Sequence, residues 1–162
     1  MFKHLFERRV APSARFWLAS GMDSAVVTGA GRGIGRGIAE LLVTRGYAVV
    51  VTDVDGDAAR RTAGEIGAVT GLEQDVREED SHARVAREAA RHGDLTVWVN
   101  NAGVGHDGTL CGVTSEHVDA LVDVNLKGVL WGMRAALASF GPRGASTLAD
   151  IESETTAAFV AA

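Results

Sequence analysis

The sequence predicts an α/β fold in which helices cover both faces of a parallel β-sheet. Short apolar runs typical of buried strands alternate with the spacing of amphipathic helices, and the alternation repeats about every 25 residues. A glycine-rich turn also separates the first expected strand from the first expected helix. Right-handed crossovers between such strands place helices on both faces, which gives a doubly wound sheet in three layers, α/β/α.

The first strand-helix-strand unit is expected near the start of this pattern. An apolar strand over 25–28 is followed by a helix, because four apolar residues recur on one helical face: Ile34, Ile38, Leu41 and Leu42. Arg45 and Gly46 are suited to end this helix, as a cationic last turn and a C-cap glycine. The second strand is expected over 47–52, where valine predominates.

The remaining elements continue the alternation in the order helix, strand, helix, strand, helix. They are expected over 57–66, 69–73, 81–91, 95–100 and 114–140. Asp55 or Asp57 is suited to cap the first of these helices, and the acidic run 78–80 opens the second. Glycine and proline at 141–142 end the last helix.

The composition fits one globular domain. The chain has 162 residues, a formal net charge of −5 and a single cysteine, Cys111. This charge gives no general attraction for nucleic acid or an anionic membrane, and no apolar run approaches the ~20 residues that span a bilayer. One cysteine excludes an intramolecular disulfide and suits a reducing compartment, so a cytoplasmic protein is expected. The histidines and Cys111 lack metal-ligand spacing, so no metal site is expected.

The two ends of the chain differ from its middle. Residues 1–21 carry a charge of +3, so residues 22–162 sum to −8. A disordered leader or an early translation start is expected at 1–21, with an organelle transit peptide as the alternative. Residues 22–140 form the expected domain. Residues 141–162 form an atypical tail, of which 146–153 can be read as a fifth strand.

The first strand runs directly into a glycine-rich turn, Thr-Gly-Ala-Gly-Arg-Gly-Ile-Gly over 28–35. A dinucleotide pyrophosphate needs a tight turn without obstructing side chains, and a helix N-terminus whose free N–H groups face the anion. Gly29, Gly33 and Gly35 stand where these demands arise. Neither the common Gly-x-Gly-x-x-Gly pattern nor the Walker pattern fits, and a flexible turn without a ligand is the alternative.

Asp53 follows the second strand directly. A carboxylate at this position accepts hydrogen bonds from the adenosine ribose hydroxyls and repels a 2′-phosphate, which favours NAD. Arg32, inside the glycine-rich turn, favours NADP because its guanidinium pairs well with a phosphate. We therefore expect NAD, with NADP possible. A solvated acid at a strand end is the alternative for Asp53.

These residues, together with three further motifs, resemble the short-chain dehydrogenase/reductase family. The motifs are Asp75-Val76, Asn-Asn-Ala-Gly over 100–103, and Val-Asn-Leu-Lys-Gly around Asn125. Their order and spacing match the family from Ala25 to Gly128. The resemblance implies a Rossmann-type sheet that binds a nicotinamide cofactor, which exchanges a hydride with an alcohol or ketone substrate.

The resemblance also implies a set of cofactor-binding residues: Gly29, Arg32, Gly33, Ile34, Gly35, Asp53, Asp75, Val76, Asn101, Ala102 and Gly103. Asp75 and Val76 would lie against the adenine, and residues 101–103 would line the cofactor where the fourth strand ends. The alternative for Asn100 and Asn101 is structural, with their amides tying strand ends together.

The chain departs from the family in its catalytic residues. The resemblance implies a Tyr that exchanges a proton with the substrate oxygen, a Lys four residues later, a Ser and an Asn. Asn125 matches that Asn, and Ser153 lies at the offset expected of the Ser. However, the only tyrosine is Tyr47, and Lys127 has Asp123 four residues before it. No Tyr-x-x-x-Lys occurs in the sequence.

We therefore expect a chain that is incomplete after about the fifth strand and impaired in hydride transfer. The missing part would include helices that usually form the dimer interface in the family. The expected partner is a small alcohol or ketone, not a nucleic acid or a membrane. Two alternatives remain: a non-catalytic dinucleotide-binding module, and a methyltransferase that uses S-adenosylmethionine.

Overall fold

The structure of the chain is a computed structural model that describes residues 21–105, 108–140, 147–151 and 158–161. Except for Gly21, the expected leader lies outside the described residues. Ser153 lies outside them as well. The expected domain over 22–140 is described almost in full.

Six strands form one sheet in the order β3-β2-β1-β4-β5-β6. In chain order they are β1 (Asp23–Val27), β2 (Ala48–Asp53), β3 (Thr70–Glu73), β4 (Asp94–Asn100), β5 (Thr147–Ile151) and β6 (Ala158–Ala161). The first five strands are parallel. The strand order reverses between β1 and β4, which makes the sheet doubly wound and confirms the expected fold class.

The sheet continues beyond the fifth strand, after which it was expected to stop. β5 pairs in parallel with β4 and antiparallel with β6, so that Ala149 stands opposite Val160. Only residues 152–157 separate β5 from β6. A parallel crossover needs a dozen or more residues, so a connection of this length permits only an antiparallel pair. The sequence-based expectation placed one strand in this tail, over 146–153, and did not include β6.

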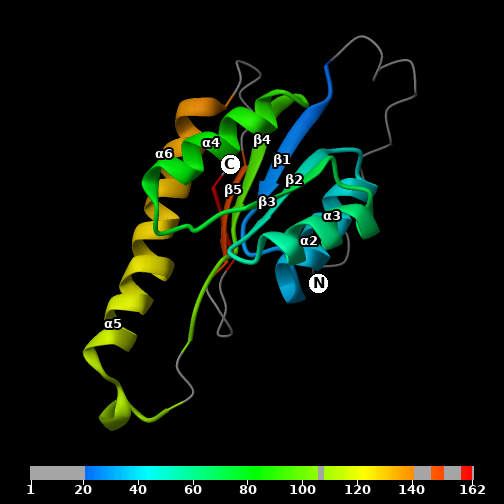
Figure 1. Cartoon of the computed structure of the whole chain (residues 1–162). Helices are drawn as coiled ribbons and strands as arrows, with labels where there is room; N and C mark the ends of the chain where they lie inside the picture. The colour runs from blue at the N-terminus through cyan, green and yellow to red at the C-terminus, as the bar shows by residue number, and fades with distance from the viewer. Residues whose placement is uncertain (1–20, 106–107, 141–146, 152–157, 162) are drawn as a thin grey trace, which may run out of the picture.

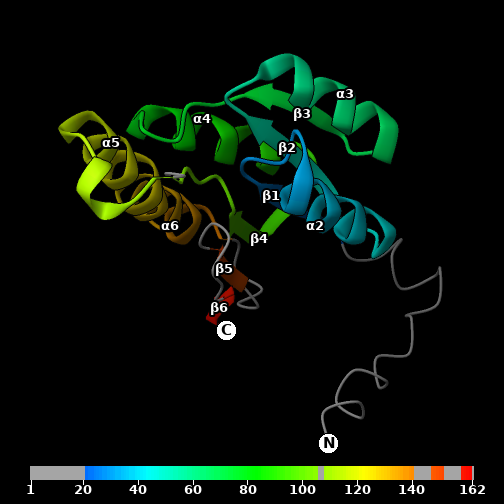
Figure 2. The same ribbon diagram turned by 90° about the horizontal axis from the view of Figure 1, so that it is seen from below.

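Helices cover both faces of the sheet: α2 (Gly33–Thr44), α3 (Gly56–Ile66), α4 (Glu79–Ala90) and α6 (Gly128–Ser139). α2 and α3 pack on one face, and α4 and α6 pack on the other (Figures 1 and 2). Alternate strand residues point to opposite faces. Val27 and Val51 therefore pack with α2 and α3, while Val26 and Val50 pack with α4 and α6.

α2 meets the sheet through smaller residues than the sequence pattern predicts. Ile38 and Leu42 pack against the core as expected, but Ile34 is 63% exposed and Leu41 is 49% exposed. The fully buried residues of α2 are Gly35 and Ala39. Because glycine and alanine add little hydrophobicity, the pattern of large apolar residues places the buried face about one residue away from its true position.

A π-helical segment interrupts the long helix expected over 114–140. Thr114 caps α5 (Ser115–Leu121), the π-helical segment η2 spans Val122–Lys127, and α6 follows directly. A π-helical turn carries an extra residue, so a search for 3.6-residue periodicity does not distinguish it from an ordinary helix. Such turns are frequent at functional sites.

Gly132 sets how closely α6 approaches β4. A Cβ at Gly132 would collide with Asn100 Oδ1, which accepts a hydrogen bond from Trp98 Nε1 at 2.9 Å. Overpacking of this kind costs about 1–3 kcal/mol. We expect Gly132→Ala to lower the free energy of unfolding by about that amount in urea denaturation followed by circular dichroism.

Gly37→Ala is the matched control for this substitution. Gly37 also lies inside a helix, but apart from its chain neighbours and the backbone of its own helix no atom lies within 4 Å of the position of its Cβ. Alanine there should raise the free energy of unfolding by about 0.5–1 kcal/mol, because it favours the helix without a clash. A stabilising Gly132→Ala would contradict the close approach of α6 to β4.

Candidate functional site

The glycine-rich turn and the end of β4 meet at the point where the strand order reverses. Gly29 has a φ of +61°, and a Cβ there would lie 2.7 Å from Ala102 Cα. Asn101 Nδ2 donates to the carbonyl oxygens of Thr28 (2.9 Å) and Gly29 (3.0 Å). Thr28 Oγ1 accepts from the N–H groups of Asn101 and Ala102. The Asn101 amide thus ties strand ends together, as in the structural alternative.

Open space lies beside the first residue of α2. Gly33 begins this helix with a φ of +60°, and apart from its chain neighbours and the backbone of its own helix no atom lies within 4 Å of where its Cβ would be. Arg32, the N-cap residue, makes no side-chain capping bond, and the first turn contains no acidic residue. The N–H groups at this end carry the positive end of the helix dipole, so the space suits an anion.

Asp53 ends β2 beside the same turn. Its Oδ2 accepts from the Gly31 N–H at 2.9 Å, and its Oδ1 accepts from the Asp55 N–H at 3.1 Å. A Cβ at Gly31 would lie 2.8 Å from Asp53 Oδ2, so the turn can approach the carboxylate only without a side chain. The two backbone donors fix a half-buried carboxylate that keeps lone pairs for hydroxyl donors.

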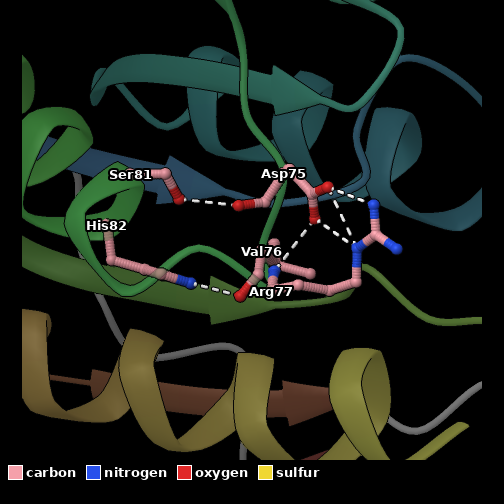
Figure 3. Close-up of polar contacts among 5 residues, drawn as sticks. All are labelled: Asp75, Val76, Arg77, Ser81 and His82. Carbon is pink, nitrogen blue, oxygen red and sulfur yellow. Dashed lines mark hydrogen bonds and ion pairs between the residues drawn. The ribbon is translucent and has the colours of Figure 1, made fainter. Parts of the chain in front are cut away.

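Asp75 and Val76 follow β3 and lie next to the end of β2, because the Gln74 N–H donates to the Asp53 carbonyl oxygen at 2.8 Å. The Asp75 carboxylate accepts from Arg77 Nε at 2.9 Å and from the Arg77 N–H at 3.0 Å (Figure 3). Hydrogen bonding from the Arg77 side chain lowers the pKa of Asp75. The sequence analysis missed Arg77, although an Asp two residues before it is typical of an Asx turn.

His82 contacts this segment from the first turn of α4. Its Nε2 lies 2.8 Å from the Val76 carbonyl oxygen (Figure 3), its ring is fully buried, and the ring stacks on Trp98 with centroids 6.0 Å apart. Burial lowers the pKa of His82 from its ordinary value of 6.5, against smaller raising effects of the Val76 carbonyl and Glu79. From the sequence, His82 was considered only as a metal ligand.

Asn125 lies in η2 and holds the chain just after β4. Its Oδ1 accepts from the Val104 N–H at 2.9 Å, and its Nδ2 donates to the Val104 carbonyl oxygen at 2.8 Å. These bonds fix the backbone that follows Gly103. The proton-relay role that the resemblance implies for Asn125 stays a prediction, as does the role of Ser153.

The chain's tyrosine and its described lysine do not form a catalytic pair. Tyr47 directly precedes β2 and is partly buried against the core, at the end of the strand away from Asp53. Lys127 Nζ forms an ion pair with Asp123 Oδ1 at 2.6 Å, and this bond raises the pKa of Lys127. A tyrosine-lysine pair at four-residue spacing is therefore absent from the described site.

The described part of the chain offers no cluster of metal ligands and no membrane-spanning helix. No three His, Cys, Asp or Glu residues in it lie close enough to hold a metal ion. None of its helices combines the length and the apolar composition needed to cross a membrane.

The sequence of the chain is similar to that of known proteins. The sequence profile described as short chain dehydrogenase matches residues 23–161. The chain is 39% identical to a sorbitol dehydrogenase of Cereibacter sphaeroides over 69% of the chain and 44% of that protein. It is 35% identical to carbonyl reductase family member 4 of Xenopus tropicalis, over 70% of the chain and 48% of that protein. The chain is also 35% identical to the oxidoreductase UcpA of Salmonella typhimurium, over 70% of the chain and 44% of that protein. The matched part thus spans less than half of each relative.

The lowered pKa of His82 predicts a pH dependence of stability. Between the folded pKa and the unfolded value of 6.5, the unfolded chain binds more protons, so stability falls as the pH falls below about 6.5. The nearby charges are Glu79 and its partner Arg134, 2.7 Å apart. His82→Gln removes this titration. The urea midpoint should therefore drop more from about pH 7.5 to about pH 5.5 in the wild type than in the variant, and equal drops would contradict this.

Proposed function

The chain belongs to the short-chain dehydrogenase family, and we propose that it binds a nicotinamide dinucleotide for hydride transfer with an alcohol or ketone. The observation that carries the proposal is the start of α2, where Gly33 leaves open space beside the first helix N–H groups and Asp53 is fixed beside the same turn. A pyrophosphate matches the first feature and an adenosine ribose matches the second.

The other parts of a dinucleotide fit the neighbouring strand ends. With the ribose at Asp53, the adenine would lie towards Asp75 and Val76, because the end of β3 adjoins the end of β2. The nicotinamide half of the dinucleotide would extend towards residues 101–103 after β4, across the point where the strand order reverses. When bound, the nicotinamide supplies or accepts the hydride. The chain's own residues bind and orient it.

We propose NAD as the preferred dinucleotide. The Asp53 carboxylate is held in place by two backbone N–H groups, so it cannot turn away from a 2′-phosphate without losing both bonds. Repulsion between these two anions opposes NADP. Arg32 at the N-cap of α2 favours NADP, because its guanidinium can pair with a 2′-phosphate. Its side chain is exposed, so solvent weakens this attraction.

The proposed substrates are small alcohols or ketones, in keeping with relatives named sorbitol dehydrogenase and carbonyl reductase. The single cysteine and the net negative charge favour a cytoplasmic protein without nucleic-acid partners. Apolar residues that recur every four positions along α5, η2 and α6 are exposed: Val118, Val122, Leu126 and Leu130.

The preference for NAD depends on the charge of Asp53. Asp53→Asn keeps the shape but removes the charge, so the ratio of the NADPH and NADH dissociation constants should fall about tenfold, equivalent to about 1.4 kcal/mol. Both constants can be measured by fluorescence titration of the purified chain. The ratio cancels any general loosening of the turn, because both dinucleotides share it.

Asp57→Asn is the matched control, since it removes a charge from α3 near the same strand end but on an exposed residue paired with Arg60. This control should leave the ratio within about twofold of the wild type. A wild-type chain that binds neither dinucleotide would overturn the proposed function. An unchanged ratio in Asp53→Asn would overturn only the role of Asp53.

We further propose that the 162-residue chain transfers hydride slowly, which makes a non-catalytic dinucleotide-binding module the second candidate function. No Tyr-x-x-x-Lys occurs in it, and general acid–base catalysis contributes about 10²–10⁴-fold. With NAD and secondary alcohols, the purified chain should turn over at least about 100-fold below the ordinary enzyme range. Turnover faster than about 0.01 s⁻¹ would contradict this. The family match argues against a methyltransferase.

A further inference from the structure

We infer that His82 is a positioning residue that holds Val76, and with it Asp75, in the conformation that receives the adenine. The inference rests on the proposed function, because it assigns a task to a residue behind the adenine end of that same site. It concerns a side chain that lies in the core beneath the segment and is itself fully buried.

The His82 ring makes one hydrogen bond to the segment after β3. Its Nε2 and the Val76 carbonyl oxygen are 2.8 Å apart, and both groups are buried (Figure 3). A carbonyl oxygen only accepts hydrogen bonds, so Nε2 must carry the proton and donate it. The neutral ring then has Nδ1 as an unprotonated acceptor.

His82 Nδ1 has no hydrogen-bond partner among the described atoms, although it is buried. A side chain needed only to fill the core would carry no such unpaired nitrogen, since an apolar side chain of similar size fills space without it. The polar contribution of His82 is therefore its one bond, to Val76. Desolvation keeps the ring neutral, and a neutral ring is what the Nε2–H tautomer requires.

Ser81, next to His82 in α4, binds the residue before Val76. Ser81 Oγ donates to the Asp75 carbonyl oxygen at 2.7 Å, so two consecutive residues of α4 bind two consecutive carbonyl groups (Figure 3). On its other side, Val76 abuts α6, where a Cβ at Gly128 would lie 3.0 Å from Val76 Cγ2. With both carbonyl groups bound by α4, the Asp75 carboxylate stays partly exposed, on the side where Arg77 binds it.

Val76 is thus fixed between a buried donor and a helix backbone. Loss of the His82 donor would leave the Val76 carbonyl oxygen buried without its partner. Turning that oxygen towards water would then lower the free energy of the segment. Such a turn would move Val76 and Asp75 together, because they are adjacent. The expected consequence is weaker binding of the adenine half of a dinucleotide, with the nicotinamide half unaffected.

Two amide variants test the role of the bond. In His82→Gln the side-chain NH₂ can stand where Nε2 stands, whereas in His82→Asn the shorter side chain leaves it about one bond length or more short of the Val76 oxygen. Both variants are neutral and polar. The ligands are NADH, AMP and reduced nicotinamide mononucleotide, which lacks the adenosine half, and their dissociation constants are measured on the full chain.

His82→Asn should raise the dissociation constants of NADH and AMP about tenfold and change that of the mononucleotide by no more than about twofold. His82→Gln should change all three dissociation constants by no more than about twofold. Equal effects of the two variants, or equal weakening of all three ligands, would overturn the inference. A wild type that binds none of the ligands would overturn the proposed function and this inference together.

A measurement on the wild type keeps the inference testable if His82→Asn does not fold. Nitrogen-15 NMR of the histidine side chains should show His82 as a neutral ring protonated at Nε2, in the free chain and with AMP bound. The opposite tautomer, or a ring protonated on both nitrogens at neutral pH, would overturn it.

Discussion

The contact between the glycine-rich turn and the end of β4 is the constraint on which the rest of the site depends. Ala102 occupies the space beside Gly29, and the Asn101 amide binds two carbonyl groups of the turn. The same turn continues into the N-terminus of α2 and, through the Gly31 N–H, holds Asp53. One close approach of two backbones therefore positions both the proposed pyrophosphate site and the proposed ribose site.

Close approach through glycine recurs on the other face of the sheet. Gly128 lets the start of α6 lie against Val76, and Gly132 lets its middle lie against Asn100. The π-helical turn just before α6 carries Asn125, whose amide fixes the backbone after β4. Both helix layers thus come close to the carboxyl ends of the strands, where the ligand of a doubly wound sheet binds. Glycine is therefore needed for the close packing of α6 as well as for the glycine-rich turn.

The parts of the fold that could be predicted are those whose signal is local. Strands β1 to β4 and helices α2 to α4 follow from apolar periodicity, and the Asp55 cap of α3 follows from residue type and position. Contacts between distant residues leave no such signal. Local patterns do not reveal that Asn101 Nδ2 donates to two carbonyl groups of the turn, that Arg77 binds Asp75, or that His82 is buried. Family motifs named the candidate site residues, but only the packing separates those that hold the backbone from those left free for a ligand.

Dinucleotide binding across the strand ends can be tested by a nitrogen-15 NMR titration of the chain with NADH, followed at the backbone amides. The largest shift changes are expected at residues 31–35, at Asp53, at Asp75 and Val76, and at residues 101–103, with small changes along α5 and the outer face of α3. Saturable binding with this distribution would support a dinucleotide placed across the ends of β1, β2, β3 and β4. Shift changes that avoid the start of α2, or the absence of any saturable change at millimolar NADH, would contradict the account.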